Sequence, residues 1–136
     1  MRTINYIAIH CTATKPDQSI DSIKNYWKNV LKWSYPGYNY IIKQGGNQVQ
    51  LLPDNLVSNG VQGFNHETIN IAYIGGITYD HDIEDTRTEQ QKISLIILLK
   101  ELRIKYPEAK IQGHRDFPGV HKLCPLFDAI PEYKDI

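Results

Sequence analysis

The sequence predicts an α/β domain in which helices flank a mixed central β-sheet. Short runs of β-branched residues alternate with two longer segments whose apolar residues recur at helical spacing. A Gly-Gly turn separates two of the short runs and indicates an antiparallel hairpin within the sheet. The length of 136 residues suits one domain that buries its own core without disulfides. We therefore expect residues 1–136 to form a single domain.

The first predicted elements are a strand and a helix. Residues 4–9 (INYIAI) form a short β-branched run, which is typical of a buried strand, and it ends at the polar and small residues 10–14. Residues 19–33 have apolar side chains at helical spacing, and Ser19 or Asp17 can cap the start of this helix. The Ser-Tyr-Pro-Gly sequence that follows ends it.

The middle of the chain predicts three more strands. Residues 38–43 (YNYIIK) and 48–52 are strands joined by the turn at 44–47, and they form the hairpin. Residues 53–68 read as a loop. Residues 69–74 (INIAYI) form a further strand, which two consecutive glycines end.

The clearest helix spans residues 88–106. Thr88 and Gln91 have the spacing of a capping box, and the dense Ile and Leu content indicates a broad face packed on the sheet. Pro107 ends this helix, residues 110–113 form a short last strand, and the remainder is expected to be irregular.

Composition excludes several classes of function. Lys plus Arg and Asp plus Glu both total 15, so no basic excess points to nucleic acid. No apolar run is long enough to insert into a membrane, and the first residues lack the apolar stretch of a secretory signal. We therefore expect synthesis in the cytoplasm. Two cysteines are too few for a disulfide framework, although a single Cys11–Cys124 bridge is conceivable.

Three side chains suit a zinc site. His10 follows the first strand, His114 follows the last, and Cys124 lies ten residues further on. Functional groups gather where strands end, and two imidazoles with one thiolate leave a fourth zinc position for water. The spacing alone leaves open that the histidines are surface or core residues.

The chain resembles a known family, the type-2 N-acetylmuramoyl-L-alanine amidases. This family includes phage amidase lysozymes and peptidoglycan recognition proteins. The resemblance rests on blocks that occur in family order over nearly the whole chain: residues 7–14 (IAIHCTAT), 37–43 (GYNYIIK), 63–66 (GFNH), 69–76 (INIAYIGG), 113–116 (GHRD) and 122–128 (KLCPLFD). It implies the mixed α/β fold of the family, peptidoglycan as partner and one Zn²⁺ per chain.

The resemblance also implies roles for individual residues. His10, His114 and Cys124 fall on the zinc ligands, while Tyr38 and Lys122 fall on the catalytic tyrosine and lysine of the phage enzymes. The implied reaction is hydrolysis of the amide between the lactyl group of N-acetylmuramic acid and L-alanine of the stem peptide. Tyr38 as a packing residue and Lys122 as a solvated loop residue are the plainer alternatives.

The chain departs from the phage pattern in two places. The interval from His114 to Cys124 is a little longer than in the phage lysozymes, so the loop that carries Lys122 can sit differently. Position 39 is Asn, where a phage lysozyme can carry His. Neither departure removes a ligand.

Further candidates lie around the expected groove. Asn65 and His66 belong to one of the family-like blocks and are candidates for substrate binding. Arg115 suits bidentate binding of a peptide carboxylate, or equally a surface ion pair. Asp116 and Asp128 are candidates to accept the distal ring proton of a ligand histidine.

Alternative functions remain at this stage. A recognition module could hold peptidoglycan without cutting it, and a structural domain could carry the trio by accident, without metal. The retained cysteine favours the enzyme, because recognition proteins that only bind typically lack it. We expect a monomer that acts on the cell wall after release or export, as a phage endolysin, an exported toxin or a housekeeping amidase.

Overall fold

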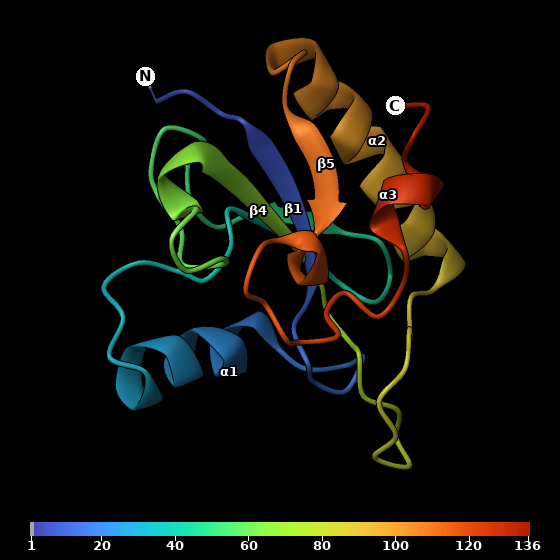
Figure 1. Ribbon diagram of the computed structural model, residues 1–136. Coiled ribbons are helices and arrows are strands. Elements are labelled where there is room, and N and C mark those ends of the chain that lie inside the picture. Colours follow the sequence, from blue (N-terminus) through green and yellow to red (C-terminus); the bar gives the residue numbers. More distant parts are fainter. Residues whose placement is uncertain (1) are drawn as a thin grey trace.

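A computed structural model describes residues 2–136 and has a five-stranded mixed sheet at its centre (Figure 1). Strand β1 is parallel to β4 and β5, β2 is parallel to β4, and β3 is antiparallel to β2. The order across the sheet is β3-β2-β4-β1-β5. The bounds are β1 Tyr6–Cys11, β2 Tyr40–Ile42, β3 Gln48–Gln50, β4 Thr68–Tyr73 and β5 Lys110–Gly113. The predicted mixed α/β sheet with its one hairpin is confirmed.

The long helix α2, Glu89–Lys105, covers one face of the sheet. Its start is the expected capping box, in which the Thr88 hydroxyl accepts from the Gln91 amide and the Gln91 side chain accepts from the Thr88 amide. Its buried leucines pack against β-branched side chains of β1 and β4 in the main core: Leu95, Leu98, Leu99 and Leu102 against Ile7, Ile9, Ile69 and Ile71.

The first helix is shorter and less regular than the sequence predicts. Helix α1 spans Ile20–Asn25, begins at the cap Ser19, and continues as one π-helical turn, η1, Tyr26–Val30. The amide of Leu31 bonds to the carbonyl of Tyr26, and the amide of Trp33 returns to the carbonyl of Trp27. Apolar spacing over one turn does not separate a π-turn from an α-turn, so the periodicity could not predict this widening. Together α1 and η1 cover the second face, where Ile23 and Trp27 join Ile41, Ala72 and Ile74.

Short helical segments occupy parts of the chain that were expected to be irregular. They are η2 (Asn65–Glu67), η3 (His114–Asp116) and α3 (Ala129–Glu132). Each is only one turn long, which is too short for a periodic pattern in the sequence. None of the helices in residues 2–136 has the length and apolar character required to cross a membrane.

The alternation of side chains along β1 prepares the candidate site. Ile7, Ile9 and Cys11 face the core beneath α2, whereas Ala8 and His10 belong to the opposite face. The register places His10 beside Ala72 of β4. His10 therefore lies near the carboxyl end of a central parallel strand, on the face that α2 leaves free.

Candidate metal centre and cleft

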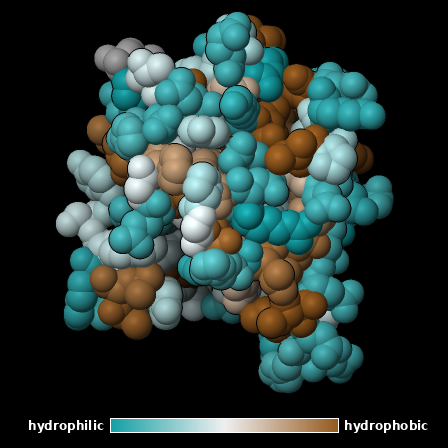
Figure 2. All heavy atoms as spheres, in the orientation of Figure 1, coloured by the Kyte–Doolittle hydropathy of each residue, from teal (hydrophilic) through white to brown (hydrophobic). Residues whose placement is uncertain are grey.

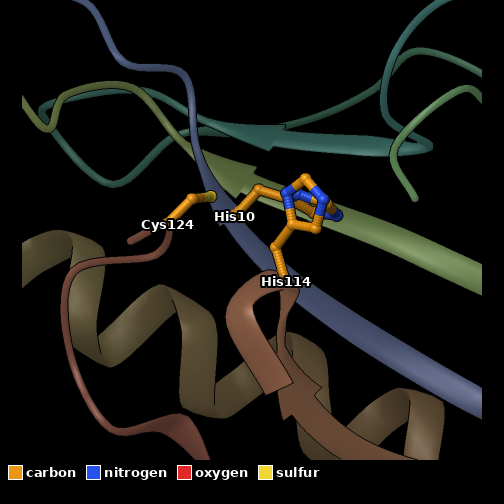
Figure 3. Close-up of side chains that lie close together, drawn as sticks. All are labelled: His10, His114 and Cys124. Atoms are coloured by element: carbon orange, nitrogen blue, oxygen red, sulfur yellow. The ribbon is translucent and has the colours of Figure 1, made fainter. Parts of the chain in front are cut away.

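The three predicted ligands come together at one edge of the sheet. Since β1 and β5 are parallel neighbours, with Ile9 opposite Gly113, the ends of the two strands bring His10 and His114 side by side, with ring centroids 4.7 Å apart. Cys124 approaches from the loop before α3. The ligand atoms of the three residues all lie within 4.8 Å of one another, and Figure 3 shows the side chains gathered at one point.

The donor set fits zinc. Ligands of a tetrahedral zinc ion lie about 3.3–3.8 Å apart, given bonds of about 2.0–2.3 Å, so only small side-chain movements are needed. Burial, then the charge of His114, lowers the pKa of His10 to about 3, with Lys122 acting in the same direction and the bond to Asn70 opposing it. Burial and then Lys122 lower the pKa of His114 to about 4. Both imidazoles are therefore neutral near pH 7, as metal ligation requires.

The thiol ligand is held by the main chain of β1. The amide of Cys11 donates to Sγ of Cys124 at 3.1 Å, and the amide of Arg115 donates to the carbonyl of Cys124 at 2.9 Å. Contact with the Cys11 thiol, and then burial, raises the pKa of the Cys124 thiol. Both cysteines are free thiols, and Cys11 is a buried core residue.

Tyr38 and Lys122 line the same cleft as the three ligands. The Tyr38 hydroxyl donates to the Cys11 carbonyl at 3.3 Å, and its ring lies 5.1 Å from that of His10 and 5.4 Å from that of Trp27. Burial, then the nearby cysteine sulfurs, raise the pKa of Tyr38 well above its ordinary value. Lys122 is exposed, and its charge reaches both histidines, as their lowered pKa values indicate.

The cleft has a volume of about 1420 Å³ and runs between α1 with η1 and the loops that precede β4 and α3. Its walls combine polar groups with aromatic rings, and they include Lys15, Gln18, Tyr26, Trp33, Asn59 and Gln62. Figure 2 shows separate hydrophobic patches between hydrophilic residues on the face drawn there. A cleft with this mixed lining can contact both polar and apolar groups of a ligand.

The other candidates have different surroundings. Among the described residues 2–136, those that line the cleft do not include Asn65, His66 or Arg115. The side-chain oxygen of Asn65 accepts from the Val61 amide at 2.7 Å, and exposed His66 lies 3.1 Å from Glu67.

The two aspartates proposed to orient the ligands have other partners. Asp116 accepts from the Gly113 amide at 2.8 Å, and Asp128 pairs with Arg115. Within residues 2–136, the side chain that hydrogen-bonds to a ligand ring is instead Asn70, whose Oδ1 lies 2.8 Å from Nε2 of His10. One feature of the sequence could have indicated Asn70: it is a polar residue in an otherwise apolar strand, and such a buried residue needs a hydrogen-bonding partner.

Comparisons with known proteins identify the family. The sequence model of a family described as N-acetylmuramoyl-L-alanine amidase matches residues 1–126. The endolysin of Enterobacteria phage T3 is 32% identical over 127 residues, which are 93% of this chain and 83% of the relative. The endolysin of Enterobacteria phage K11 is 34% identical over 122 residues, which are 88% and 79% of the two chains.

Solved structures extend the likeness to the fold. The Ph2119 endolysin from Thermus scotoductus MAT2119 bacteriophage Ph2119 has a TM-score of 0.79 at 26% identity, covering 92% of this chain and 79% of its own. The N-acetylmuramoyl-L-alanine amidase LysC from Clostridium intestinale has a TM-score of 0.78 at 27% identity, covering 96% and 82%. PGRP-SA of Apis mellifera shares the fold, with a TM-score of 0.80 at 20% identity, covering 99% and 84%. This chain belongs to the N-acetylmuramoyl-L-alanine amidase family and is an amidase of that type.

Proposed function

We propose that this amidase uses one zinc ion, held by His10, His114 and Cys124, to hydrolyse the amide between the N-acetylmuramic acid lactyl group and L-alanine of peptidoglycan. We also propose that residues 1–136 act as one domain, as a monomer, on the cell wall after release or export. The observation that carries the proposal is the convergence of two neutral imidazoles and a thiol in a cleft that Tyr38 and Lys122 also line. Zinc, when bound there, would activate water and polarise the carbonyl of the amide.

Lys122 is proposed to stabilise the charge that develops on the substrate carbonyl oxygen. Its ammonium lines the cleft and is near enough to the ligand histidines to lower their pKa. A positive charge placed where an oxyanion forms stabilises the transition state more than the ground state. The residue is exposed, so substrate binding would also have to exclude water around it for the charge to have its full effect.

Tyr38 is proposed to act as a hydrogen-bond donor. Its raised pKa keeps the phenol protonated, so it can donate to the substrate or to the attacking water but is a poor general base. Its present bond to the Cys11 carbonyl is long, at 3.3 Å, and it can be exchanged for a bond to a ligand. The packing of its ring against Trp27 holds the hydroxyl oxygen in position.

The test is to incubate the purified chain with bacterial peptidoglycan, with and without a zinc chelator, and to identify the products by mass spectrometry. Stem peptides with a new alanine amino terminus, lost with chelator and restored by zinc, would support the proposal. Intact peptidoglycan with stoichiometric zinc bound would favour a recognition module. Release of sugar fragments would show that a different bond is cut.

Two variants test the residue roles, with one control. Lys122→Ala should keep zinc and lose most turnover, whereas Lys134→Ala, which removes an exposed lysine from the C-terminal segment, should behave as wild type. Tyr38→Phe should keep the fold and zinc but lower kcat. Unchanged turnover in either cleft variant would remove that residue from the mechanism.

A further inference from the structure

A chain of hydrogen bonds runs from the candidate metal centre into the interior. Its four members are His10, Asn70, Ser58 and Asn39, and all are buried, with at most 1% of each residue exposed. His10 Nε2 lies 2.8 Å from Asn70 Oδ1, Asn70 Nδ2 lies 2.8 Å from the Ser58 hydroxyl, and Ser58 lies 2.7 Å from Asn39 Oδ1. Buried polar side chains that are all partnered rigidify one arrangement of the groups around them.

The far end of this chain of hydrogen bonds, at Asn39, determines which group donates and which accepts in each bond. The Nδ2 group of Asn39 donates to the main-chain carbonyls of Pro53 and Leu56, both at 3.2 Å. Carbonyl oxygens only accept, so the amide of Asn39 cannot be turned around without losing both bonds. Its Oδ1 must then accept, and it does so from the main-chain amide of Asn70 at 3.0 Å and from the hydroxyl of Ser58.

The orientation of Asn39 in turn determines the donor and acceptor in each further hydrogen bond, up to the ligand His10. Because the Ser58 proton is used toward Asn39, the Ser58 oxygen accepts from Nδ2 of Asn70. Asn70 is thereby forced to present Oδ1 to His10, and only a protonated Nε2 can donate to it. The lone pair of His10 is then left on Nδ1.

We propose that Asn70, held in this orientation by Ser58 and Asn39, is the positioning residue for His10. It determines that Nε2 of the neutral ring carries the proton, and it aims the free Nδ1 at the metal. This inference rests on the proposed zinc site. Main-chain carbonyls four hydrogen bonds away thus determine which imidazole nitrogen is available to zinc. Partners of this kind hold a ligand ring in its productive orientation, and their loss commonly weakens metal binding about 10–100-fold.

The packing around Asn70 agrees with a side chain that is held in place. Gly60 lies directly against its amide: a Cβ atom at position 60 would be 2.3 Å from Cγ and Oδ1 of Asn70. Asn70 Nδ2 also lies 3.3 Å from Oδ1 of Asn65, which is another acceptor. A flipped Asn70 would place its carbonyl oxygen against that acceptor, so the surroundings oppose the reverse orientation.

The experiment has two readouts, neither of which is activity. In the zinc-free wild type, a long-range ¹H–¹⁵N spectrum of the labelled chain should show His10 protonated on Nε2 and bare on Nδ1. Zinc affinity, measured by competition with a chromophoric chelator, should fall about 10–100-fold in Asn70→Ala, and its His10 Nε2 proton signal should be lost.

The matched control is Thr68→Val in the same strand. Thr68 is equally buried, and its hydroxyl donates to the Phe64 carbonyl at 2.7 Å, away from the ligands. This variant should lose stability but keep wild-type zinc affinity and the His10 signal. If Asn70→Ala does not fold, Asn70→Asp replaces it, because a carboxylate still accepts from His10. This variant should keep the His10 Nε2 proton signal.

Two results would overturn the inference. One is a spectrum of the wild type, or of Asn70→Asp, with His10 protonated on Nδ1. The other is Asn70→Ala binding zinc no more weakly than Thr68→Val. Failure of the wild type to bind zinc would sink the proposed function instead, while the spectrum of the zinc-free chain would still decide whether Asn70 sets the protonation of His10.

Discussion

A buried guanidinium joins the segment before α2 to the C-terminal helix, and its removal gives a quantitative test of the fold. The Arg87 side chain is 3% exposed and pairs with Asp85 at 2.9 Å and with Glu132 of α3 at 2.7 Å. It also lies 3.3 Å above the ring centre of Phe127 and donates to the Tyr133 hydroxyl at 3.2 Å. These contacts anchor the chain just beyond Cys124.

Arg87→Met should lower the free energy of unfolding by about 3 kcal/mol. Removing one partner of a buried ion pair costs about 3–5 kcal/mol. The low end applies because the two carboxylates, Asp85 and Glu132, are 27% and 39% exposed and can be solvated once unpaired. Met fills most of the space over Phe127, so the cavity contributes little.

The acid range adds an independent check on this estimate. Arg87 lowers the pKa of Glu132 below its ordinary 4.5. A carboxyl with a lowered folded-state pKa stabilises the fold above its unfolded pKa, and this stabilisation is lost as the pH falls through the folded value. The difference between wild type and Arg87→Met should therefore be smaller at about pH 3 than at about pH 7.

The assay is urea unfolding followed by tryptophan fluorescence, with chelator present so that zinc does not add to stability. Arg115→Met is the matched control, since Arg115 pairs with Asp128, which is 77% exposed, and the variant should cost less than about 1 kcal/mol. Equal losses in the two variants, or a loss below about 1 kcal/mol in Arg87→Met, would refute the reasoning.

Three further predictions concern the ligands and the core. Between about pH 5 and pH 7, zinc affinity measured by chelator competition should rise about tenfold per pH unit. The reason is that only the Cys124 thiol releases a proton on binding, because burial keeps both histidine ligands neutral. A much steeper rise below pH 6 would contradict the lowered histidine pKa values. Leu99→Ala, at a fully buried position on the core-facing side of α2, should cost about 2–5 kcal/mol in urea unfolding, and a smaller loss would mean that the core collapses around the gap. Gly60→Ala should displace Asn70 and weaken zinc binding, and wild-type affinity would show that the loop gives way instead.

Local pattern predicted most of the fold because the strands are short apolar runs with clear ends. The capping box at Thr88 placed the start of α2, and the hairpin turn placed β2 beside β3. The structure brings His10, His114 and Cys124 together as expected, because parallel strands end at the same edge of the sheet.

What sequence reasoning missed depends on which strands are neighbours. Asn70 reaches His10 only because β4 lies next to β1 in a register that pairs Ala8 with Asn70, and sequence alone does not give strand order. Asp116 was a plausible partner from its nearness in sequence to His114. A local bond to the Gly113 amide holds its carboxylate instead, as short polar side chains often bond to nearby main chain.

The end of β1 shows how two adjacent residues can serve one site through different atoms. His10 offers its side chain to the site, whereas the Cys11 side chain points into the core against Gly76, where an added Cβ would lie 2.9 Å from its sulfur. Cys11 contributes main-chain atoms: its amide holds the Cys124 sulfur and its carbonyl holds the Tyr38 hydroxyl. The spacing of ligand, thiol and phenol therefore depends on the main chain of one strand, which the core residues on its other face keep in place.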